Sequence, residues 1–323
     1  MKPLESSEQY TSSSTMDLKS ISKPTIWLGY FLLAILSLIW GVSWPVMKVI
    51  LNEVPPWTFR LYCMIFSGIG FSLLIKSRGI SLKIPREDFK PLLISSFLNI
   101  TLWYILSAFA IANMNASRAS IIAYTMPVWS ALLSVFILKE RMTKGRFISL
   151  FLGMSGIAIL IGPDIVVFKT APLGAITMLF AAFFWGTGIV AIKYYKWTMP
   201  TIVLSCWSLI IGGIPLTMGA IIFETDAIFA PISFQCLLGL IYVVILGNIV
   251  AFWAWYKIMA IFPPTVASIG ILMVPIIGVF SSSLMLEEPV GLLEITALIL
   301  VVSSLSIVTI PPGLFNKKPA QEK

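Results

Sequence analysis

The sequence predicts an all-α integral membrane protein whose ten transmembrane helices form two inverted five-helix repeats. Three observations lead to this fold class. Of the 323 residues, 58% are hydrophobic and only 11% are charged, too few charges to cover a soluble domain of this length. Ten apolar runs have about the 20 residues needed to cross the hydrocarbon core of a bilayer. The third observation is an internal sequence repeat that relates the two halves of the chain.

The predicted spans are separated by short breaks that carry Pro, Gly or charged residues, where irregular backbone can reach water. They lie near residues 27–47, 57–75, 91–112, 119–138, 147–163, 172–192, 200–222, 233–256, 264–286 and 290–310. The fifth span is short, and only a few residues separate the eighth from the ninth. At these two places the count of ten could become nine.

The basic residues set the predicted orientation. If the N-terminus is inside, 18 of the 22 Lys and Arg residues fall in inner segments. This asymmetry is what the positive-inside rule predicts for an even number of spans with both termini cytoplasmic. The expected organisation is a disordered Ser-rich tail at 1–25, repeats at 26–165 and 170–311, and a cytoplasmic tail at 312–323.

The internal repeat is seen in two pairs of segments. ASIIAYTMPVWSALLSVFILKE at 119–140 matches ASIGILMVPIIGVFSSSLMLEE at 267–288, each with a Pro and a Glu 13 residues apart. IWGVSWPVMK at 39–48 matches FWGTGIVAIK at 184–193. Because the repeated unit has five helices, an odd number, the second copy enters the membrane from the opposite side. Inverted repeats of this kind place the substrate site of a transporter near the midplane, between the copies.

These motifs resemble the drug/metabolite transporter superfamily, specifically its EamA-type ten-helix branch. The resemblance rests on the IWG start of the first half and its counterpart FWG, on Arg60 in WTFRLYCMIF, and on the paired Pro and Glu; it covers residues 27–310. The second half departs from the pattern, because SCWS at 205–208 stands where an Arg would correspond to Arg60. The resemblance implies a central cavity, a location in the cell inner (cytoplasmic) membrane, and export of amino acids or other small metabolites.

Other classes of function find little support. The sequence has no His, and its three Cys lie in apolar runs, so we expect no metal site, no cofactor and no enzymatic activity. Basic residues cluster between apolar stretches, so the net charge of +8 does not indicate a nucleic-acid partner. The expected partners are a small-molecule substrate and the lipid bilayer; monomer and homodimer both remain open.

Neutral polar and aromatic residues inside the spans are the candidate substrate ligands. Asn99 and Asn248 occupy nearly equivalent places in the repeat, and each is followed by aromatic residues four to seven positions later. An Asn can orient a solute by hydrogen bonding while an aromatic face holds an apolar or cationic group. The alternative is that these amides only bond neighbouring helices together. The full candidate set is Asn99, Trp103, Tyr104, Tyr124, Asn248, Trp253, Trp255, Trp40, Ser43, Trp44 and Trp185.

Two prolines and one glutamate are candidates for the transport mechanism. Pro127 and Pro275 each fall mid-span, where loss of a backbone hydrogen bond favours a kink, and we expect them to be hinges. No carboxylate lies well inside a span, which favours facilitated diffusion or exchange. Proton-coupled antiport through Glu294, near the start of the last span, is the alternative. A non-transporting scaffold or receptor is a further alternative.

Overall fold

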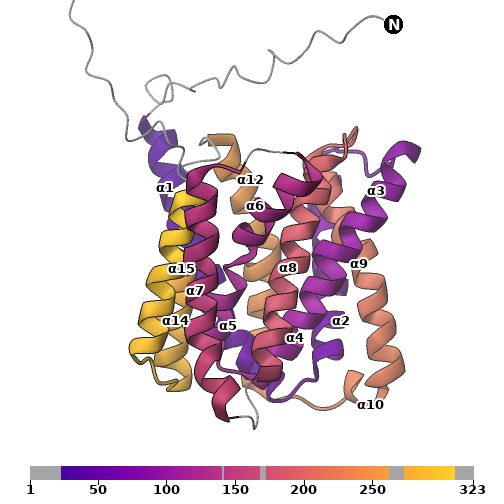
Figure 1. Ribbon diagram of the computed structural model, residues 1–323. Coiled ribbons are helices and arrows are strands. Elements are labelled where there is room, and N and C mark those ends of the chain that lie inside the picture. The colour runs from indigo at the N-terminus through magenta and orange to yellow at the C-terminus, as the bar shows by residue number, and fades with distance from the viewer. Residues whose placement is uncertain (1–22, 140–141, 168–171, 262–272, 310–323) are drawn as a thin grey trace, which may run out of the picture.

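The computed structural model describes residues 23–139, 142–167, 172–261 and 273–309, which form one bundle of helices (Figure 1). Within these residues there is no strand. The π-helical segments, η2 and η3, each continue directly from one α-helix into the next. The elements are α1 (Lys23–Leu51), α2 (Pro56–Ser77), α3 (Arg86–Ser96), η2 (Phe97–Leu102), α4 (Trp103–Asn113), α5 (Ala116–Ala123), α6 (Met126–Ile137), α7 (Lys144–Val167), α8 (Pro172–Tyr194), α9 (Thr201–Phe223), α10 (Thr225–Ile228), α11 (Phe234–Ile241), η3 (Tyr242–Val250), α12 (Ala251–Ile261), α14 (Met273–Leu286) and α15 (Leu292–Thr309).

The described helices have the length and surface of a membrane protein. Seven stretches are long and apolar enough to cross a membrane: Ile26–Leu51, Pro56–Ser77, Arg86–Asn113, Ala116–Ile137, Leu173–Tyr194, Ile202–Phe223 and Phe234–Trp255. Three shorter apolar helices, Phe147–Gly156, Met273–Leu286 and Leu292–Ile307, fall within predicted spans five, nine and ten. Large apolar side chains such as Phe66, Ile69 and Phe136 are exposed on the outside, as hydrocarbon requires. The predicted class of helical integral membrane protein is confirmed, whereas the count of ten stays a prediction.

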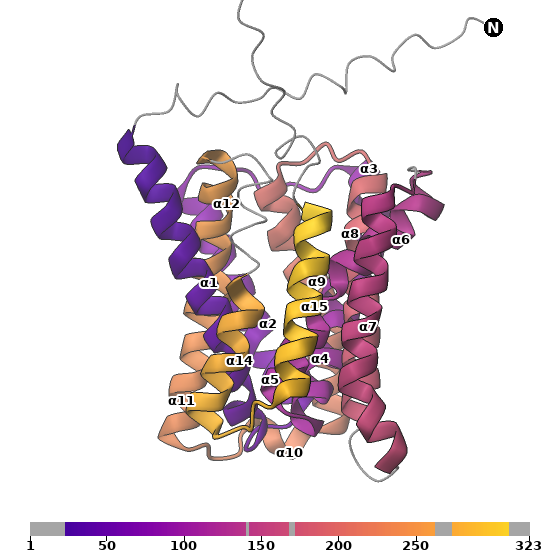
Figure 2. The same cartoon turned by 60° about the vertical axis from the view of Figure 1, so that its left-hand side comes forward.

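Helices of the two predicted halves interleave. α1 packs on α12 and α14, and α8 packs on α4 and α6. α2 lies against α9, and α7 runs alongside α15 (Figure 1). The set of pairs is unchanged when each helix is exchanged for its counterpart in the predicted repeat: α1 for α8, α2 for α9, α4 for α12, α6 for α14 and α7 for α15. The start of α1 and the end of α15 lie at the same end of the bundle, as Figure 2 shows.

Of the two candidate hinge prolines, Pro127 does not stand inside a continuous α-helix, because the span Ala116–Ile137 breaks just before it; a hinge role for either proline stays a prediction. α5 ends at Ala123 and α6 begins at Met126, which places Pro127 in the first turn of α6. Proline is well tolerated there because the N–H it lacks has no partner within the helix. Pro275 is buried in α14, close to the first described residue of that helix, Met273. The preceding residues, 262–272, lie outside the described part of the chain, as does Glu140.

Carboxylates from one half bind the helix starts of the other. Glu224, after α9, accepts bonds from the backbone N–H of Trp57 and Thr58 at the start of α2, at 3.3 and 2.7 Å. Asp88, in α3, accepts bonds from the N–H of Thr198 and Met199 just before α9, at 3.1 and 3.0 Å. The first four N–H groups of a helix have no partner within it, and a carboxylate also interacts favourably with the helix dipole. Both helices of the α2–α9 pair therefore have their starts capped by a carboxylate from the other half of the chain.

Two further caps close the end of the bundle that contains the loop between α14 and α15. The Glu288 carboxylate accepts bonds from the N–H groups of Ala116 and Ser117 at 2.7 and 2.9 Å, and from the Ser117 hydroxyl at 2.6 Å, at the start of α5. Glu53, after α1, accepts bonds from the N–H and hydroxyl of Ser233, the residue before α11, at 2.8 and 2.5 Å. Each cap joins segments more than 150 residues apart in the sequence.

Candidate functional site

A buried arginine joins α2 to α4. Arg60 stands one turn into α2, and only 3% of its surface is exposed. Its Nε donates to the backbone carbonyl of Tyr104 at 2.7 Å, and one terminal nitrogen donates to the Ser107 hydroxyl at 2.9 Å. The guanidinium carbon also lies 4.8 Å from the centre of the Tyr104 ring and 4.5 Å from that of Phe59. Stacking against aromatic faces is a favourable environment for a guanidinium group in a dry interior.

The polar contacts continue from Tyr104 into the second half of the chain. The Tyr104 hydroxyl lies 3.5 Å from Oδ1 of Asn248, the outer limit for a direct bond, so this contact is weak. The Asn248 amide nitrogen donates to the Ser67 hydroxyl at 2.8 Å. Arg60 and Ser67 are seven residues apart on α2 and therefore lie on one face of that helix. We call Arg60, Ser67, Tyr104, Ser107 and Asn248 the polar cluster.

Arg60 brings an uncompensated positive charge into this cluster. In the described part of the chain no carboxylate lies within ion-pair distance of Arg60; the Arg that does pair with an acid is Arg118, with Glu294 at 2.9 Å. A guanidinium group has five N–H donors, and two of those on Arg60 reach oxygen acceptors. The other terminal nitrogen lies 4.0 Å from the sulfur of Met47, and the guanidinium group also contacts the Cys63 thiol, so its remaining partners are sulfur atoms. The site can therefore accept an anionic group, and a carboxylate matches the fork of donors.

Of the residues predicted from the sequence, Tyr104 and Asn248 belong to the polar cluster. Another group lies around α1: the Trp40 ring centre is 6.3 Å from that of Trp255, and its indole N–H donates to the Gly247 carbonyl at 3.1 Å. Trp253 packs in the same apolar group. Ser43 donates to a carbonyl of its own helix, that of Ile39. These side chains flank η3 rather than the arginine.

The remaining predicted residues form two aromatic contacts and one amide contact. Trp44 and Tyr124 are both buried, with ring centres 6.5 Å apart. Trp103 and Trp185 have ring centres 6.2 Å apart. The Asn99 amide donates to the Trp185 carbonyl at 3.2 Å. This bond joins two helices, which is the alternative to substrate binding given above for the two Asn residues. Whether any of these residues binds a solute stays a prediction.

The sequence interpretation missed three members of the polar cluster: Arg60, Ser67 and Ser107. Arg60 was noted only as part of a resemblance, because it lies close to a predicted span end. The available signal was its charge within the apolar run WTFRLYCMIF, since ionisable residues in spans usually face a bundle interior or a cavity. Ser67 and Ser107 carried no signal of their own.

The carboxylates near span ends are more buried than their positions indicated. Asp88, Glu288 and Glu294 are exposed by 1%, 9% and 5%. Glu294 is bonded to Arg118 and also accepts the N–H of Gly291 at 2.9 Å, at the start of its own helix. All three carboxylates therefore bind helix starts or an arginine. No group of three potential metal-ligating side chains occurs among the described residues.

Comparisons with known proteins show which family contains this fold and this polar cluster. The EamA-like transporter family matches residues 27–162 and 172–310. The uncharacterized transporter YvbV of Bacillus subtilis is 30% identical over 284 residues, covering 86% of this chain and 90% of the relative. A probable amino-acid metabolite efflux pump of Escherichia coli is 25% identical over 278 residues, covering 83% and 90%. One solved crystal structure has the same fold, with a TM-score of 0.61, 19% sequence identity and coverage of 85% of this chain and 95% of that one.

Proposed function

The chain belongs to the EamA-like transporter family of the drug/metabolite transporter superfamily, and we propose that it exports small carboxylate-bearing solutes such as amino acids or related metabolites. It is a multi-pass membrane transporter and not an enzyme. The proposed mechanism is alternating access around the polar cluster. The proposed location is the cytoplasmic membrane, with both termini on the cytoplasmic side.

The observation that carries this proposal is the buried charge of Arg60. Transfer of an unpaired ion into a low-dielectric interior costs several kcal/mol. Attraction to a partner of opposite charge offsets this cost. Arg60 is 3% exposed and has no such partner among the described residues. A solute carboxylate would supply the missing charge and two acceptor oxygens. The Asn248 amide and the Tyr104 hydroxyl stand close enough to bond a second polar group of the same solute.

The arrangement of the helices supports alternating access. The helix pairs named above are unchanged when each helix is exchanged for its counterpart, and the family matches two separate stretches of nearly equal length. Both features favour two inverted repeats, whose relative rocking opens a central site to one side at a time. In this scheme Pro127, which follows the break between α5 and α6, and Pro275 in α14 would be the places where the helices bend.

Facilitated diffusion or exchange remains the preferred driving mechanism. The buried carboxylates already bind helix N–H groups or Arg118, so protonation of any of them would remove bonds that hold the bundle together. Glu294 is the residue to test for proton coupling, because it lies next to a cation. The similarity to a probable amino-acid metabolite efflux pump of Escherichia coli supports an amino-acid-like cargo for this chain as well.

The test is counterflow uptake of a labelled amino acid into proteoliposomes preloaded with the same unlabelled amino acid, with unlabelled acids and the corresponding amides as external competitors. We expect acids to compete about 10- to 100-fold better than amides, the range for one charge-assisted hydrogen-bonded pair. Arg60→Lys keeps the positive charge but loses the planar set of guanidinium N–H donors. This variant should therefore lose most of the preference for acids over amides. Arg78→Lys is the matched control, because Arg78 is exposed at the far end of α2.

Equal competition by acids and amides would refute the carboxylate site while leaving the family assignment in place. If Arg60→Lys kept the wild-type preference for acids over amides, another residue would have to bind the carboxylate. An imposed pH gradient that drives uptake, and fails to do so in Glu294→Gln, would replace facilitated diffusion by proton coupling. The thermal unfolding midpoint of each variant shows whether its fold is intact.

A further inference from the structure

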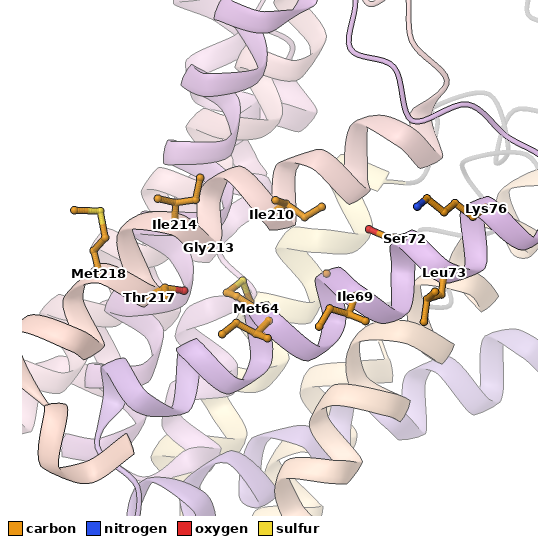
Figure 3. Close-up of a pocket in the computed structure, with 12 residues that line it drawn as sticks. Met64, Ile69, Ser72, Leu73, Lys76, Ile210, Gly213, Ile214, Thr217 and Met218 are labelled. Carbon is orange, nitrogen blue, oxygen red and sulfur yellow. The ribbon is translucent and has the colours of Figure 1, made fainter. Parts of the chain in front are cut away.

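A groove runs along the outside of the bundle between α2 and α9 (Figure 3). Its volume is about 520 Å³, within the range of roughly 300–1,000 Å³ that is typical of pockets for small ligands. Its walls are mostly aliphatic, with Ser72, Thr217 and Lys76 as the polar side chains.

The groove faces the bilayer rather than the polar cluster. Ile65, Ile69 and Leu73 line it at helical spacing on α2 and are 40%, 54% and 62% exposed. Ser67, which bonds Asn248, is fully buried on another face of the same helix. On α9 the exposed Ile214 and Met218 line the opposite wall. A hydrocarbon chain of the membrane therefore has direct access to the groove.

Small residues allow the two helices to approach closely at the floor of the groove. A Cβ atom on Gly213 would lie 2.8 Å from Cβ of Met64, and one on Gly68 would lie 3.3 Å from a carbon of Ile210. Small residues at such contacts let membrane helices pack backbone to backbone. The larger side chains on either side then stand above the contact as walls, which produces a long and narrow apolar channel.

One end of the channel is positively charged. Lys76 lies in the last turn of α2, and Figure 3 shows it at the end of the groove away from Met218. No acidic residue lines the groove. A lysine near a span end extends its ammonium group to the level of the lipid phosphates. We propose that the groove binds an anionic phospholipid, with an acyl chain between α2 and α9 and the headgroup phosphate at Lys76.

A second copy of the chain fits the groove less well than a lipid does. In a two-fold symmetric dimer the same surface meets itself, so one concave channel would face another and leave both unfilled. The same symmetry would bring Lys76 of each copy to the same depth in the membrane, where like charges repel. A single flexible acyl chain fills a narrow channel without either cost.

Native mass spectrometry of the full chain in neutral detergent tests this proposal, with palmitoyl-oleoyl phosphatidylglycerol and the matching phosphatidylcholine as probes. We expect one phosphatidylglycerol to be retained about fivefold more tightly than phosphatidylcholine, the effect of one lysine near a lipid surface. Lys76→Gln should remove that preference. Arg78→Gln, a neighbouring basic residue that does not line the groove, should keep it.

Blocking variants test the acyl chain separately. Ile69→Trp or Leu73→Trp should weaken retention of both lipids, whereas Phe66→Trp should not, because Phe66 is exposed on α2 but lies outside the groove. Equal retention of the two lipids by the wild type would overturn the proposal. So would a preference that survives Lys76→Gln, or a protein dimer that Ile69→Trp dissociates. Unfolding midpoints without added lipid confirm that each variant is folded.

Discussion

Two π-helical segments interrupt corresponding helices of the predicted repeat, yet their surroundings differ. η2 lies between α3 and α4 and contains Asn99; η3 lies between α11 and α12 and contains Asn248. Each contacts the first helix of the opposite half: η2 contacts α8, and η3 contacts α1. The equivalent position in the fold is therefore retained, whereas the contacts of the two amides are not.

The difference lies in the residues that the other helices present. Asn99 faces the backbone of α8 at Gly188, where a Cβ atom would come within 2.6 Å of Cβ of Asn99. Asn248 is 5% exposed and faces the side chains of Ser67 and Tyr104. One segment is thus specialised for close helix packing, and the other for polar contact next to a buried charge. Symmetry of the fold does not require symmetry of the site.

The largest effect should come from the packing side of the comparison. Gly188→Ala puts a methyl group 2.6 Å from Cβ and 3.0 Å from Cα of Asn99, so backbone has to move. We expect a loss of about 2–3 kcal/mol in unfolding free energy, in the upper range for overpacking. Gly247→Ala in η3 is the control, because its nearest contact is the Ser43 hydroxyl at 3.4 Å. Equal losses in the two variants, measured by denaturant titration, would mean that the segments are packed alike.

The two amides should differ less, and in the opposite sense. Asn248→Ala leaves the Ser67 and Tyr104 hydroxyls without this partner, and we expect it to cost about 1.5 kcal/mol, near the upper limit measured for hydrogen bonds between membrane helices. Asn99→Ala loses one bond to a carbonyl and should cost about 0.6 kcal/mol. A double-mutant cycle of Asn248→Ala with Ser67→Ala measures the coupling. Additive effects would show that the bond contributes nothing.

The smallest effect concerns the helix starts that lead into the two segments. Before η3, Ser233 caps α11 and binds Glu53; before η2, α3 starts after Pro85 without a side-chain cap. The Ser233 hydroxyl and N–H hold the pKa of Glu53 below its ordinary value of 4.5. A lowered pKa contributes stability that is complete above pH 4.5 and is lost as the pH falls through the lowered value. The unfolding midpoint of the wild type should therefore drop slightly more than that of Glu53→Gln between pH 6 and pH 3; parallel curves would exclude this contribution.

The helical membrane fold could be predicted from the sequence because hydrocarbon leaves the backbone few choices. Apart from the ninth span, whose first residues lie outside the described part of the chain, the described helices follow the predicted spans to within about six residues, as in 57–75 against Pro56–Ser77 and 200–222 against Thr201–Phe223. A kink was predicted at Pro127, whereas the helix breaks at Tyr124 and Thr125, just before the proline. The two-repeat organisation stays a prediction that the helix pairing supports.

The site could be predicted only in part, because a linear sequence does not show which side chains meet. Asn248 and Tyr104 were selected by residue type, but their neighbour Ser67 is a small hydroxyl that occurs in many spans. Arg60 was not among the predicted substrate ligands, because it lies one turn from a helix start, a position that is usually close to water. Its burial depends on α4, which supplies a carbonyl, a hydroxyl and an aromatic face at that depth. Such long-range contacts were not readable from spacing.

The carboxylate caps have a consequence for the order of events during synthesis. Thr58 and Ser117 begin helices α2 and α5, but the acids that cap these helices, Glu224 and Glu288, follow them by 166 and 171 residues. At about 5–20 residues per second, a ribosome needs roughly 10–30 s to add that length of chain. When α2 and α5 are synthesised, the N–H groups of their first turns therefore do not yet have the carboxylates that cap them. The first half therefore completes these caps only after the residues that carry the capping acids have been synthesised.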